Sequence, residues 1–395
     1  MSRRSSSGKA ARKSCSTKGY ALSEVWICRR CIIVFEKFTG AKIRQFAGLY
    51  KQTVVRLIVF FFAISNKRRT FVPEVLRRQT SELEMKVLVA PLNWGLGHAA
   101  RCVPIVRKYV AAGDEVVLGG DGESLLLLRR AFPELRWVPL AQLHLKYDRG
   151  KRQRLFYWRA VPQLLCFSLA DRRCLRALLR KECFDLVVSD NRFGLRSHRT
   201  RCVYMTHQLY VRLPKRLRLL EPLARALHRA VYKRFDEVWV PDYASAEHNL
   251  SGALSHGGDM DTRVRYIGPL SRLEVPAVVA DSPYKVVAVL SGLEPQRTVF
   301  ERELLRRFAH SKQPVLLVRG KMTEPWTCVT MGNVTMVPYM DDASLVCALT
   351  GAERIIVRSG YSTVMDLEHI GVLRKAEWHP TPDQPEQEYL AVHNA

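Results

Sequence analysis

Short apolar runs alternate with segments of helical periodicity along most of this chain. The first run, with Val87, Leu88 and Val89 at its centre, follows directly on Met85. The same pattern predicts four further strands in this part, at Glu115–Leu118, Leu186–Ser189, Val203–Met205 and Glu237–Val240. Helical patterns separate these strands, including Glu123–Ala131 and Leu217–Arg234. Strands that alternate with helices predict a largely parallel sheet with helices on both faces.

A second series of the same kind follows a break at residues 267–283, where three prolines interrupt the pattern. It comprises a helix at Gln296–His310 and strands at Val286–Leu290, Val315–Val318, Val334–Val337 and Ile355–Val357. We therefore expect an α/β fold of two tandem, doubly wound, Rossmann-like domains. They would span residues 85–270 and 285–395, with a linker at 271–284, and face each other across a cleft. Two domains also suit the 311 residues involved, which exceed what one core usually supports.

Residues 1–84 differ from the remainder in composition. They hold 18 Lys and Arg against 5 Glu, so their net charge is +13, whereas residues 85–395 spread the other +13 over 311 positions. The opening Ser-, Arg- and Lys-rich stretch is typical of disorder, and the apolar run Leu57–Ile64 is too short to span a bilayer. Three interpretations stay open: a wrongly assigned start codon, a basic arm for a membrane surface or nucleic acid, or a targeting segment.

The ten cysteines show no disulfide framework, which is typical of reduced thiols in a cytosolic protein. Cys28 and Cys31 form a single CxxC pair, and structural zinc needs four ligands, so we expect no metal there. The total charge of +26 permits binding to nucleic acid, but no stacking motif or nucleic-acid fold signature accompanies it. Nucleic acid is therefore not expected as a partner.

A glycine turn directly after the first strand is the strongest candidate for a binding loop. Gly95 and Gly97 would let the backbone approach a phosphate or sugar, and the following helix offers free N–H groups to an anion. His98 could act as a base or donor near neutral pH, and Arg101, one turn later, could complement a phosphate. The same residues could instead shape a tight turn and cap a helix.

Polar residues also follow two other strands of the first series. Asp190, after the strand Leu186–Ser189, could orient an acceptor hydroxyl or remove its proton. Thr206, His207 and Gln208 end the next strand. Since Asp, Asn and similar residues are also ordinary turn formers, a structural role is the alternative for each.

The second series carries its own candidates at strand ends. Ser and Gly at a helix start expose N–H donors to a diphosphate, and a carboxylate in the first turns could bind ribose hydroxyls. Two polar residues near the end of the chain could bind a sugar, or simply begin a solvated helix after Pro385. The candidates are Ser291, Gly292, Arg358, Ser359, Gly360, Thr363, Asp366, Gln387 and Glu388.

Three stretches together resemble the GT-B glycosyltransferases of family 28, which include the peptidoglycan enzyme that adds N-acetylglucosamine to lipid-linked muramyl-pentapeptide. They are GLGHAAR at 95–101, RSGYSTVMDLEHIG at 358–371 and DQPEQEYLA at 383–391. The resemblance implies that the first loop faces the donor diphosphate and acceptor, and that the second binds the diphosphate. Asp366 stands where the family has a ribose-binding glutamate, and Gln387 and Glu388 stand where it has two residues that contact the donor sugar.

The chain departs from this family in two places. Residues 371–378 are polar where relatives have an apolar strand, and the sequence stops before the terminal helices that usually pack onto the first domain, so the second domain looks shortened. The resemblance implies transfer of a hexose or N-acetylhexosamine from a nucleoside diphosphate sugar, UDP-linked, to an acceptor hydroxyl. It implies inversion at the anomeric carbon, no bound metal and no cofactor beyond the donor. His98 or Asp190 would be the base.

Basic and aromatic residues at Lys146–Arg159 suit an anionic membrane face or a lipid-linked acceptor. We therefore expect a cytoplasmic protein of cell-envelope biosynthesis, peripheral on the inner face of the plasma membrane. Two other functions remain open. One is a nucleotide-sugar 2-epimerase on the same fold, and the other is a non-catalytic protein that binds a nucleotide sugar or nucleic acid.

Overall fold

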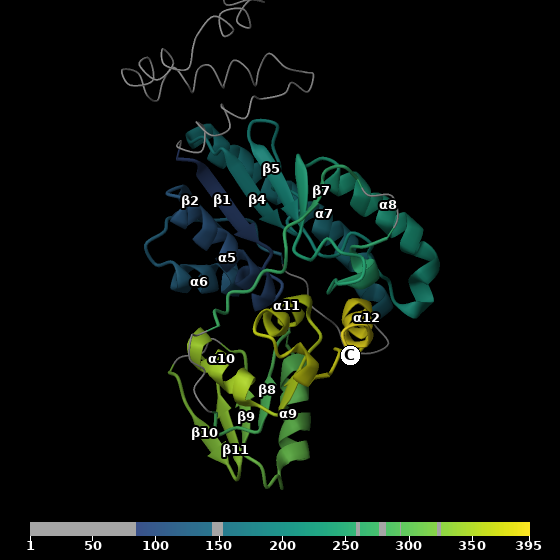
Figure 1. Cartoon of the computed structure of the whole chain (residues 1–395). Helices are drawn as coiled ribbons and strands as arrows, with labels where there is room; N and C mark the ends of the chain where they lie inside the picture. The colour runs from purple at the N-terminus through teal and green to yellow at the C-terminus, as the bar shows by residue number, and fades with distance from the viewer. Residues whose placement is uncertain (1–83, 144–152, 258–260, 276–281, 293, 322–324) are drawn as a thin grey trace, which may run out of the picture. The chain divides into compact units, whose positions relative to one another are not determined.

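A computed structural model describes residues 84–395 except 144–152, 258–260, 276–281, 293 and 322–324 (Figure 1). Residues 84–395 form one compact unit. The predictions for the basic segment 1–83 and for most of Lys146–Arg159 concern residues outside this described part, or side chains of residues 153–159 that are not described.

The first part of the unit is built on a seven-stranded sheet in which all neighbouring strands are parallel. The strand order is β3-β2-β1-β4-β5-β6-β7. The strands are β1 Lys86–Pro91, β2 Glu115–Gly120, β3 Trp137–Pro139, β4 Leu186–Asp190, β5 Arg201–Met205, β6 Glu237–Val240 and β7 Val264–Tyr266. The order runs outward in opposite directions from β1 and β4, so the chain reverses its winding between these two strands. Such a switch point is where open parallel sheets bind ligands.

Helices cover both faces of this sheet because successive side chains of each strand point to opposite sides. Val87 and Val89 of β1 pack in one core with residues of α5 (Leu96–Ala111) and α6 (Gly122–Ala131), the two helices that Figure 1 draws on one side of this sheet. Leu88 and Ala90 belong to the other face, in the core that includes residues of α7 and α8. The remaining elements here are α7 Gln153–Lys181, η3 Lys215–Leu220, α8 Glu221–Tyr232 and η4 Gly252–Leu254.

A six-stranded sheet of order β10-β11-β9-β8-β12-β13 forms the second part. All its pairings are parallel except β10 with β11. The strands are β8 Val286–Val289, β9 Val315–Val318, β10 Val329–Met331, β11 Val334–Val337, β12 Arg354–Val357 and β13 Ala376–Trp378. The helices are α9 Gln296–Phe308, α10 Asp342–Gly351, α11 Tyr361–His369, η5 Leu373–Lys375 and α12 Pro385–His393.

The α/β fold with two sheets of mostly parallel strands confirms the predicted fold class, and every predicted strand is present. The predicted helix Leu217–Arg234 begins instead as the 3₁₀ turn η3, and α8 ends at Tyr232. The polar stretch 371–378 does contain a strand, β13. Its backbone pairs with β12, while Glu377 forms ion pairs with Arg307 and Arg354, so a charged residue on this edge strand is satisfied without an apolar run.

The two sheets share a small core of their own. Leu250 and Leu254, which follow β6, pack with Tyr361 and Met365 of α11 and with Leu390 of α12. The Tyr361 hydroxyl donates a 2.9 Å hydrogen bond to the carbonyl of Pro241. These contacts fix the start of α11 against the loop after β6.

A fully buried arginine, Arg192, ties three elements together just after β4. Its guanidinium donates to Asp171 of α7 (2.7 Å) and to Asp121 (3.0 Å), the residue before α6. The carbonyls of Pro91 and Ala141 accept two further bonds. Because two carboxylates and two carbonyls surround one buried cation, the desolvation of these charges is compensated by direct hydrogen bonds.

No helix among the described residues has the length and apolar character needed to cross a membrane.

Replacing Arg192 by methionine should therefore unfold the chain more easily, because Asp121 and Asp171 would stay buried without a cation. We expect the free energy of unfolding to fall by about 3–5 kcal/mol, measured by urea denaturation. Arg201→Met is the matched control, since Arg201 has a 53% exposed side chain and pairs with Glu237 at the surface. That substitution should cost no more than about 1 kcal/mol. Equal losses in the two variants would contradict the role given to Arg192.

Candidate active site

The turn between β1 and α5 ends with a glycine that the backbone requires. Gly95 precedes α5 with a φ of 76°, a conformation that side chains other than glycine rarely adopt. Gly97 is required for a different reason. A Cβ at Gly97 would lie 2.7 Å from the Oγ of Ser362, which donates a 3.0 Å hydrogen bond to the Gly97 carbonyl. The first turns of α5 and α11 therefore touch at this glycine, which brings a turn of each sheet together.

His98, Arg101 and Asp190 meet at the switch point. Asp190 ends β4 and lies in register with Pro91, the last residue of β1. Its Oδ2 accepts from Nε of Arg101 at 2.8 Å and lies 3.1 Å from Nδ1 of His98, and its Oδ1 accepts from a second nitrogen of Arg101. Asp190 and Arg101 are buried, whereas the His98 side chain is 15% exposed. Of the two candidate bases, only His98 reaches the solvent.

The charges in this cluster shift its pKa values. Burial alone would raise the pKa of Asp190, but the positive Arg101 and the neighbouring His98 outweigh it and hold that pKa well below its usual range. Burial lowers the pKa of His98 below its ordinary value of 6.5; Arg101 lowers it further, although Asp190 opposes both. At neutral pH the cluster thus contains an ionised Asp190 and a neutral His98.

Arg101 also connects this cluster to α12. One of its nitrogens lies 3.0 Å from Nδ1 of His207, which follows β5. Because arginine only donates, His207 accepts at Nδ1 and carries its proton on Nε2, which donates to Glu386 at 2.8 Å. The His207 ring stacks on Tyr361 of α11, with ring centres 4.2 Å apart. Burial opposes ionisation of Glu386, yet His207 and Arg101 lower its pKa.

Glu386, Tyr361 and Ser362 were not predicted as site residues, and His207 was named only among the polar residues that follow β5. Gln387 and Glu388 were predicted instead. The Gln387 side chain accepts from the backbone N–H of Thr381, and Glu388 is exposed. Glu386, one position earlier in α12, is the residue that contacts His207 of the first sheet. The contact of Gln387 and Glu388 with a donor sugar stays a prediction.

The predicted site residues near the start of α11 come from two turns of the second sheet. Ser291 and Gly292 follow β8, and Arg358, Ser359 and Gly360 follow β12. β8 and β12 are neighbours, so the two turns leave the same edge of the sheet. Gly360 precedes α11 without a side-chain cap, which leaves the first N–H groups of α11 without intrahelical partners. Thr363 lies in this first turn.

Arg358 points away from that open helix end. Its guanidinium lies 4.0 Å above the ring of Phe300 and donates to the carbonyls of His379 and Pro380, each at 3.0 Å. Ser359 likewise donates to the carbonyl of Gln387 at 2.7 Å. In this structure both side chains position the segment that leads into α12. The predicted contact of Arg358 with a diphosphate stays a prediction.

Asp366, in the second turn of α11, is the most strongly perturbed acid on that helix. The hydroxyl of Ser271, in the segment after β7, donates to it at 2.6 Å. Burial raises the pKa of Asp366 to about 6, although Ser271 and Arg272 both lower it. Asp366 therefore sits between the two sheets with a carboxylate that ionises near neutral pH.

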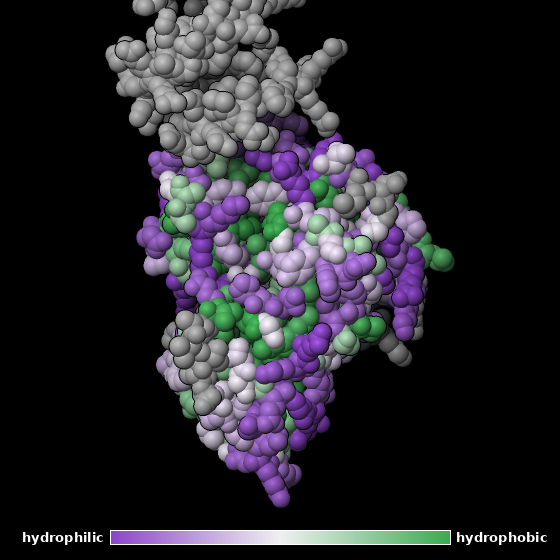
Figure 2. All heavy atoms as spheres, in the orientation of Figure 1, coloured by the Kyte–Doolittle hydropathy of each residue, from purple (hydrophilic) through white to green (hydrophobic). Residues whose placement is uncertain are grey.

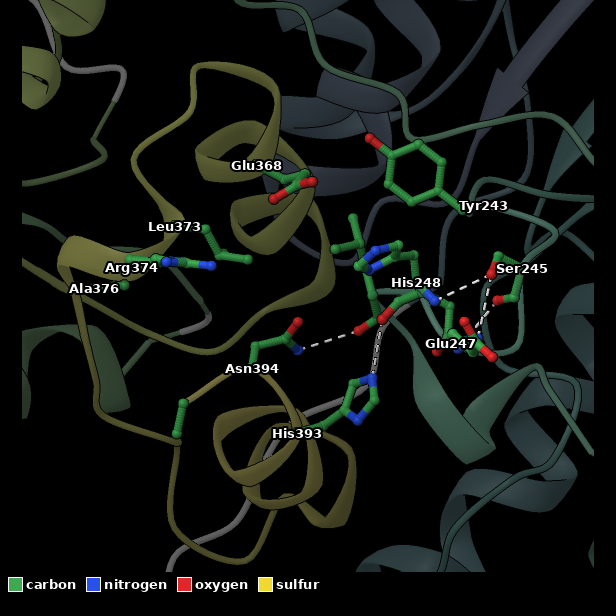
Figure 3. A pocket seen from close by; sticks show the side chains of 13 residues that line it. Tyr243, Ser245, Glu247, His248, Glu368, Leu373, Arg374, Ala376, His393 and Asn394 are labelled. Carbon is green, nitrogen blue, oxygen red and sulfur yellow. Dashed lines mark hydrogen bonds between the residues drawn. The ribbon is translucent and has the colours of Figure 1, made fainter.

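A separate cavity of about 780 Å³ lies beside α12 and contains none of the predicted site residues (Figure 3). His393 and Asn394, at the end of α12, donate hydrogen bonds to the carbonyls of Asn249 and Leu250, and all four residues line the cavity. Its lining residues are Tyr243, Ser245, Glu247, His248, Asn249, Leu250, Glu368, Leu373, Arg374, Ala376, His393, Asn394 and Ala395. Among the described residues, no group of three or more His, Cys, Asp or Glu side chains is placed to hold a metal ion.

No protein-family model matches the chain. Two proteins named as uncharacterized glycosyltransferases, from Methanosarcina acetivorans and Methanosarcina mazei, are each 22% identical to it over 303 residues, which cover 73% of this chain and 78% of each relative. The solved glycosyltransferase of kitacinnamycin aligns with a TM-score of 0.55 at 15% identity, covering 79% of this chain and 84% of its own. The calicheamicin glycosyltransferase CalG4 aligns with a TM-score of 0.52 at 14% identity, covering 78% and 84%.

The chain resembles the GT-B glycosyltransferases. The sequence comparison supports this through relatives that bear the name glycosyltransferase, and the structural comparison shows that the fold is shared. The predicted resemblance to GT-B glycosyltransferases is thereby confirmed, while the resemblance to family 28 stays a prediction. In this chain the first turns of α5 and α11 are in contact at Gly97 and Ser362.

The contact at Gly97 can be tested by a paired substitution. Gly97→Ala should lower the thermal unfolding midpoint by several degrees, because its Cβ would overlap the Ser362 hydroxyl and push α11 away from α5. Adding Ser362→Ala removes the overlapping oxygen and should recover most of the loss. Differential scanning calorimetry of both variants and of Ser362→Ala alone measures this. If Ser362→Ala does not rescue Gly97→Ala, the two turns do not meet as described.

Proposed function

We propose that this chain is a glycosyltransferase that moves a hexose or N-acetylhexosamine from a UDP-linked donor to an acceptor hydroxyl. The observation that carries the proposal is the pairing of a partly exposed, neutral His98 with a buried, ionised Asp190, one turn from the contact between α5 and α11. The names of the sequence relatives support the enzyme class. Metal ions and cofactors other than the donor have no part in the proposed reaction.

His98 is the proposed base. A base function requires the tautomer in which Nδ1 donates its proton to Asp190, since Nε2 then keeps a free lone pair. A nitrogen of Arg101 also lies 2.9 Å from this Nδ1. When the acceptor is bound, Nδ1 must therefore donate its proton to Asp190 and not accept a hydrogen bond from Arg101. Nε2 would take the proton of the acceptor hydroxyl as its oxygen attacks the anomeric carbon. General-base catalysis of this kind contributes about 10²–10⁴-fold to a rate.

The start of α11 is the proposed site of the departing diphosphate. The bond between the anomeric carbon and the diphosphate oxygen breaks, and its electron pair leaves with the nucleoside diphosphate. The uncapped N–H groups after Gly360, including that of Thr363, would stabilise the growing negative charge together with the helix dipole. A single displacement of this kind inverts the anomeric carbon. Ser291 and Gly292, on the neighbouring turn, would line the same site.

Asp366 is the proposed ligand of the ribose hydroxyls. An ionised carboxylate can accept from two hydroxyls at once, and Asp366 ionises near pH 6. Similar solved structures include a UDP-glucosyltransferase from Polygonum tinctorium and the spinosyn rhamnosyltransferase SpnG complexed with thymidine diphosphate. Since uridine and thymidine differ in the 2′-hydroxyl, a carboxylate that binds both ribose hydroxyls favours UDP.

The acceptor is proposed to be a lipid-linked or cell-envelope glycan, handled by a cytoplasmic protein at the membrane surface. The alternative is a 2-epimerase, which would change the donor sugar and release no glycosylated product. A protein that only binds a nucleotide sugar is the second alternative.

The full chain should be incubated with UDP-glucose, UDP-N-acetylglucosamine and the matching dTDP sugars, with a glycan-lipid acceptor mixture. Release of UDP with a glycosylated product supports the transferase, an epimerised donor supports the epimerase, and binding without turnover supports the binding protein.

Substitution of His98 tests the proposed base. His98→Ala should lower kcat by at least about 100-fold, and added imidazole should restore part of the activity. Because the pKa of His98 lies below 6.5, the wild-type rate should stay constant at neutral pH and fall only below pH 6.5, where the imidazole becomes protonated. His248→Gln, an exposed histidine outside the cluster, is the control and should keep the wild-type profile. An unchanged rate in His98→Ala would show that another group is the base.

Substitution of Asp366 tests the donor site separately. UDP binding, measured by calorimetry, should strengthen as pH rises through about 6, because ionisation of Asp366 creates the hydroxyl acceptor. Asp366→Asn should weaken UDP binding by about tenfold at pH 7.5 and remove this pH dependence. Glu368→Gln, on the same helix, is the matched control. If Asp366→Asn binds UDP with the wild-type pH dependence, the ribose lies elsewhere.

A further inference from the structure

Four leucines on η3 and α8 are far more exposed than leucine normally is in a folded protein. Leu219 is 96% exposed, Leu223 58% and Leu227 62%, and Leu220 is also exposed. The spacing of Leu219, Leu223 and Leu227, about one helical turn, places these three along one side of the segment, and Leu220 directly follows Leu219. Figure 2 shows hydrophobic atoms standing out at the edge of the molecule where Figure 1 draws α8. The segment therefore presents a continuous apolar ridge to the solvent.

The opposite side of α8 already has its packing partners. His228 contacts the hydroxyl of Tyr204 through Nε2 at 3.1 Å, and burial lowers the pKa of His228 to about 4. Tyr232 is buried in the core of the seven-stranded sheet and stands edge-on to the His228 ring. Since α8 is fixed to the sheet by this side, the leucines cannot turn inward without breaking these contacts.

Positive charge dominates the segment that carries the leucine ridge. Residues 212–234 contain eight Lys and Arg and a single acid, Glu221. That acid is engaged locally, because it accepts from the backbone N–H of Leu213 and lies 3.6 Å from Arg225. Arg218, Arg229 and Lys233 therefore face no compensating acid within the segment. An exposed apolar face with a basic flank is the pattern by which amphipathic helices lie in the headgroup region of anionic bilayers.

We propose that the η3–α8 ridge, defined by Leu219, Leu220, Leu223 and Leu227, docks the protein on an anionic lipid surface. The leucines enter the boundary between headgroups and acyl chains, and the arginines and lysines pair with lipid phosphates while their aliphatic stems lie along the apolar layer. This site differs from the predicted membrane surface at Lys146–Arg159. It does not depend on the proposed glycosyl transfer, because the docking can be measured without any substrate.

Two other occupants fit the ridge less well. Nucleic acid would use the positive charges, but four exposed leucines find no partner on a phosphate backbone. A second copy of this chain would cover the leucines, yet it would set the basic flank of one copy against that of the other if the contact were two-fold symmetric. An anionic lipid surface satisfies the leucines and the charges together.

The test measures binding of the full chain to vesicles by co-sedimentation at physiological salt. Vesicles of phosphatidylcholine and phosphatidylglycerol should bind the wild type, and vesicles of phosphatidylcholine alone should bind it far more weakly. L219Q/L223Q/L227Q should lower the partition coefficient at least about tenfold, because the protein loses three leucines that would be buried in the bilayer while helix propensity is kept. Residues 1–83 contribute equally to both proteins, so the difference reports on the ridge.

Two further variants keep the result interpretable. L219Q alone changes an almost fully exposed side chain, so it should fold normally and still reduce partitioning about threefold. V329T/M331Q alters two exposed apolar residues of β10 in the other sheet and should bind as the wild type does. R218Q/R229Q/K233Q should bind anionic vesicles more weakly than the wild type does, and its binding should depend less on salt.

The proposal is overturned if both leucine variants partition as the wild type does, or if the wild type binds neutral and anionic vesicles equally. It is also overturned if analytical ultracentrifugation shows that the leucine variants convert a dimer into a monomer without any change in vesicle binding. In that case the ridge is an interface between two copies of the chain.

Discussion

The ion pair between Asp190 and Arg101 is the interaction on which the candidate active site depends. Both side chains are buried, and taking two charges out of water costs several kcal/mol unless hydrogen bonds satisfy them. Here the guanidinium contacts both carboxylate oxygens as well as His98 and His207. Asp190 and His207 accept hydrogen bonds from this buried cation, which holds both side chains in place. Nδ1 of His98 lies within hydrogen-bond distance of both Asp190 and Arg101, so the ion pair also positions the His98 ring.

The same cation links the two sheets. Because Arg101 fixes Nδ1 of His207 as an acceptor, the proton of His207 is directed at Glu386 of α12. If α12 moved away, Glu386 would leave His207 without its acceptor, and the hydrogen bonding around Arg101 would have to change. The stack of His207 on Tyr361 brings α11 into the same arrangement. Hydrogen bonds around Arg101 and this ring stack therefore connect the proposed base with the start of α11.

The sequence was informative where a single local rule decides the structure. Fully apolar runs predicted the central strands, and the glycine turn and the acid at the end of β4 pointed to the switch point. It was less informative where long-range contacts decide the direction of a side chain. Arg358 follows a strand as a phosphate ligand would, yet Phe300 and two carbonyls hold it inside. Glu386 was missed because only the packing of α12 on the first sheet distinguishes it from its polar neighbours. β13 was missed because its pairing with β12 uses backbone groups and does not require apolar side chains.

The arginine after β4 has a consequence for how this chain can diverge. Arg192 pairs with both Asp121 and Asp171, which come from elements far apart in the sequence. Loss of Arg192 would leave two carboxylates buried without a cation, whereas loss of one aspartate would still leave an ion pair with the other. Among distant relatives, position 192 should therefore stay basic wherever positions 121 and 171 are acidic, although none of the three residues is a candidate to touch a substrate.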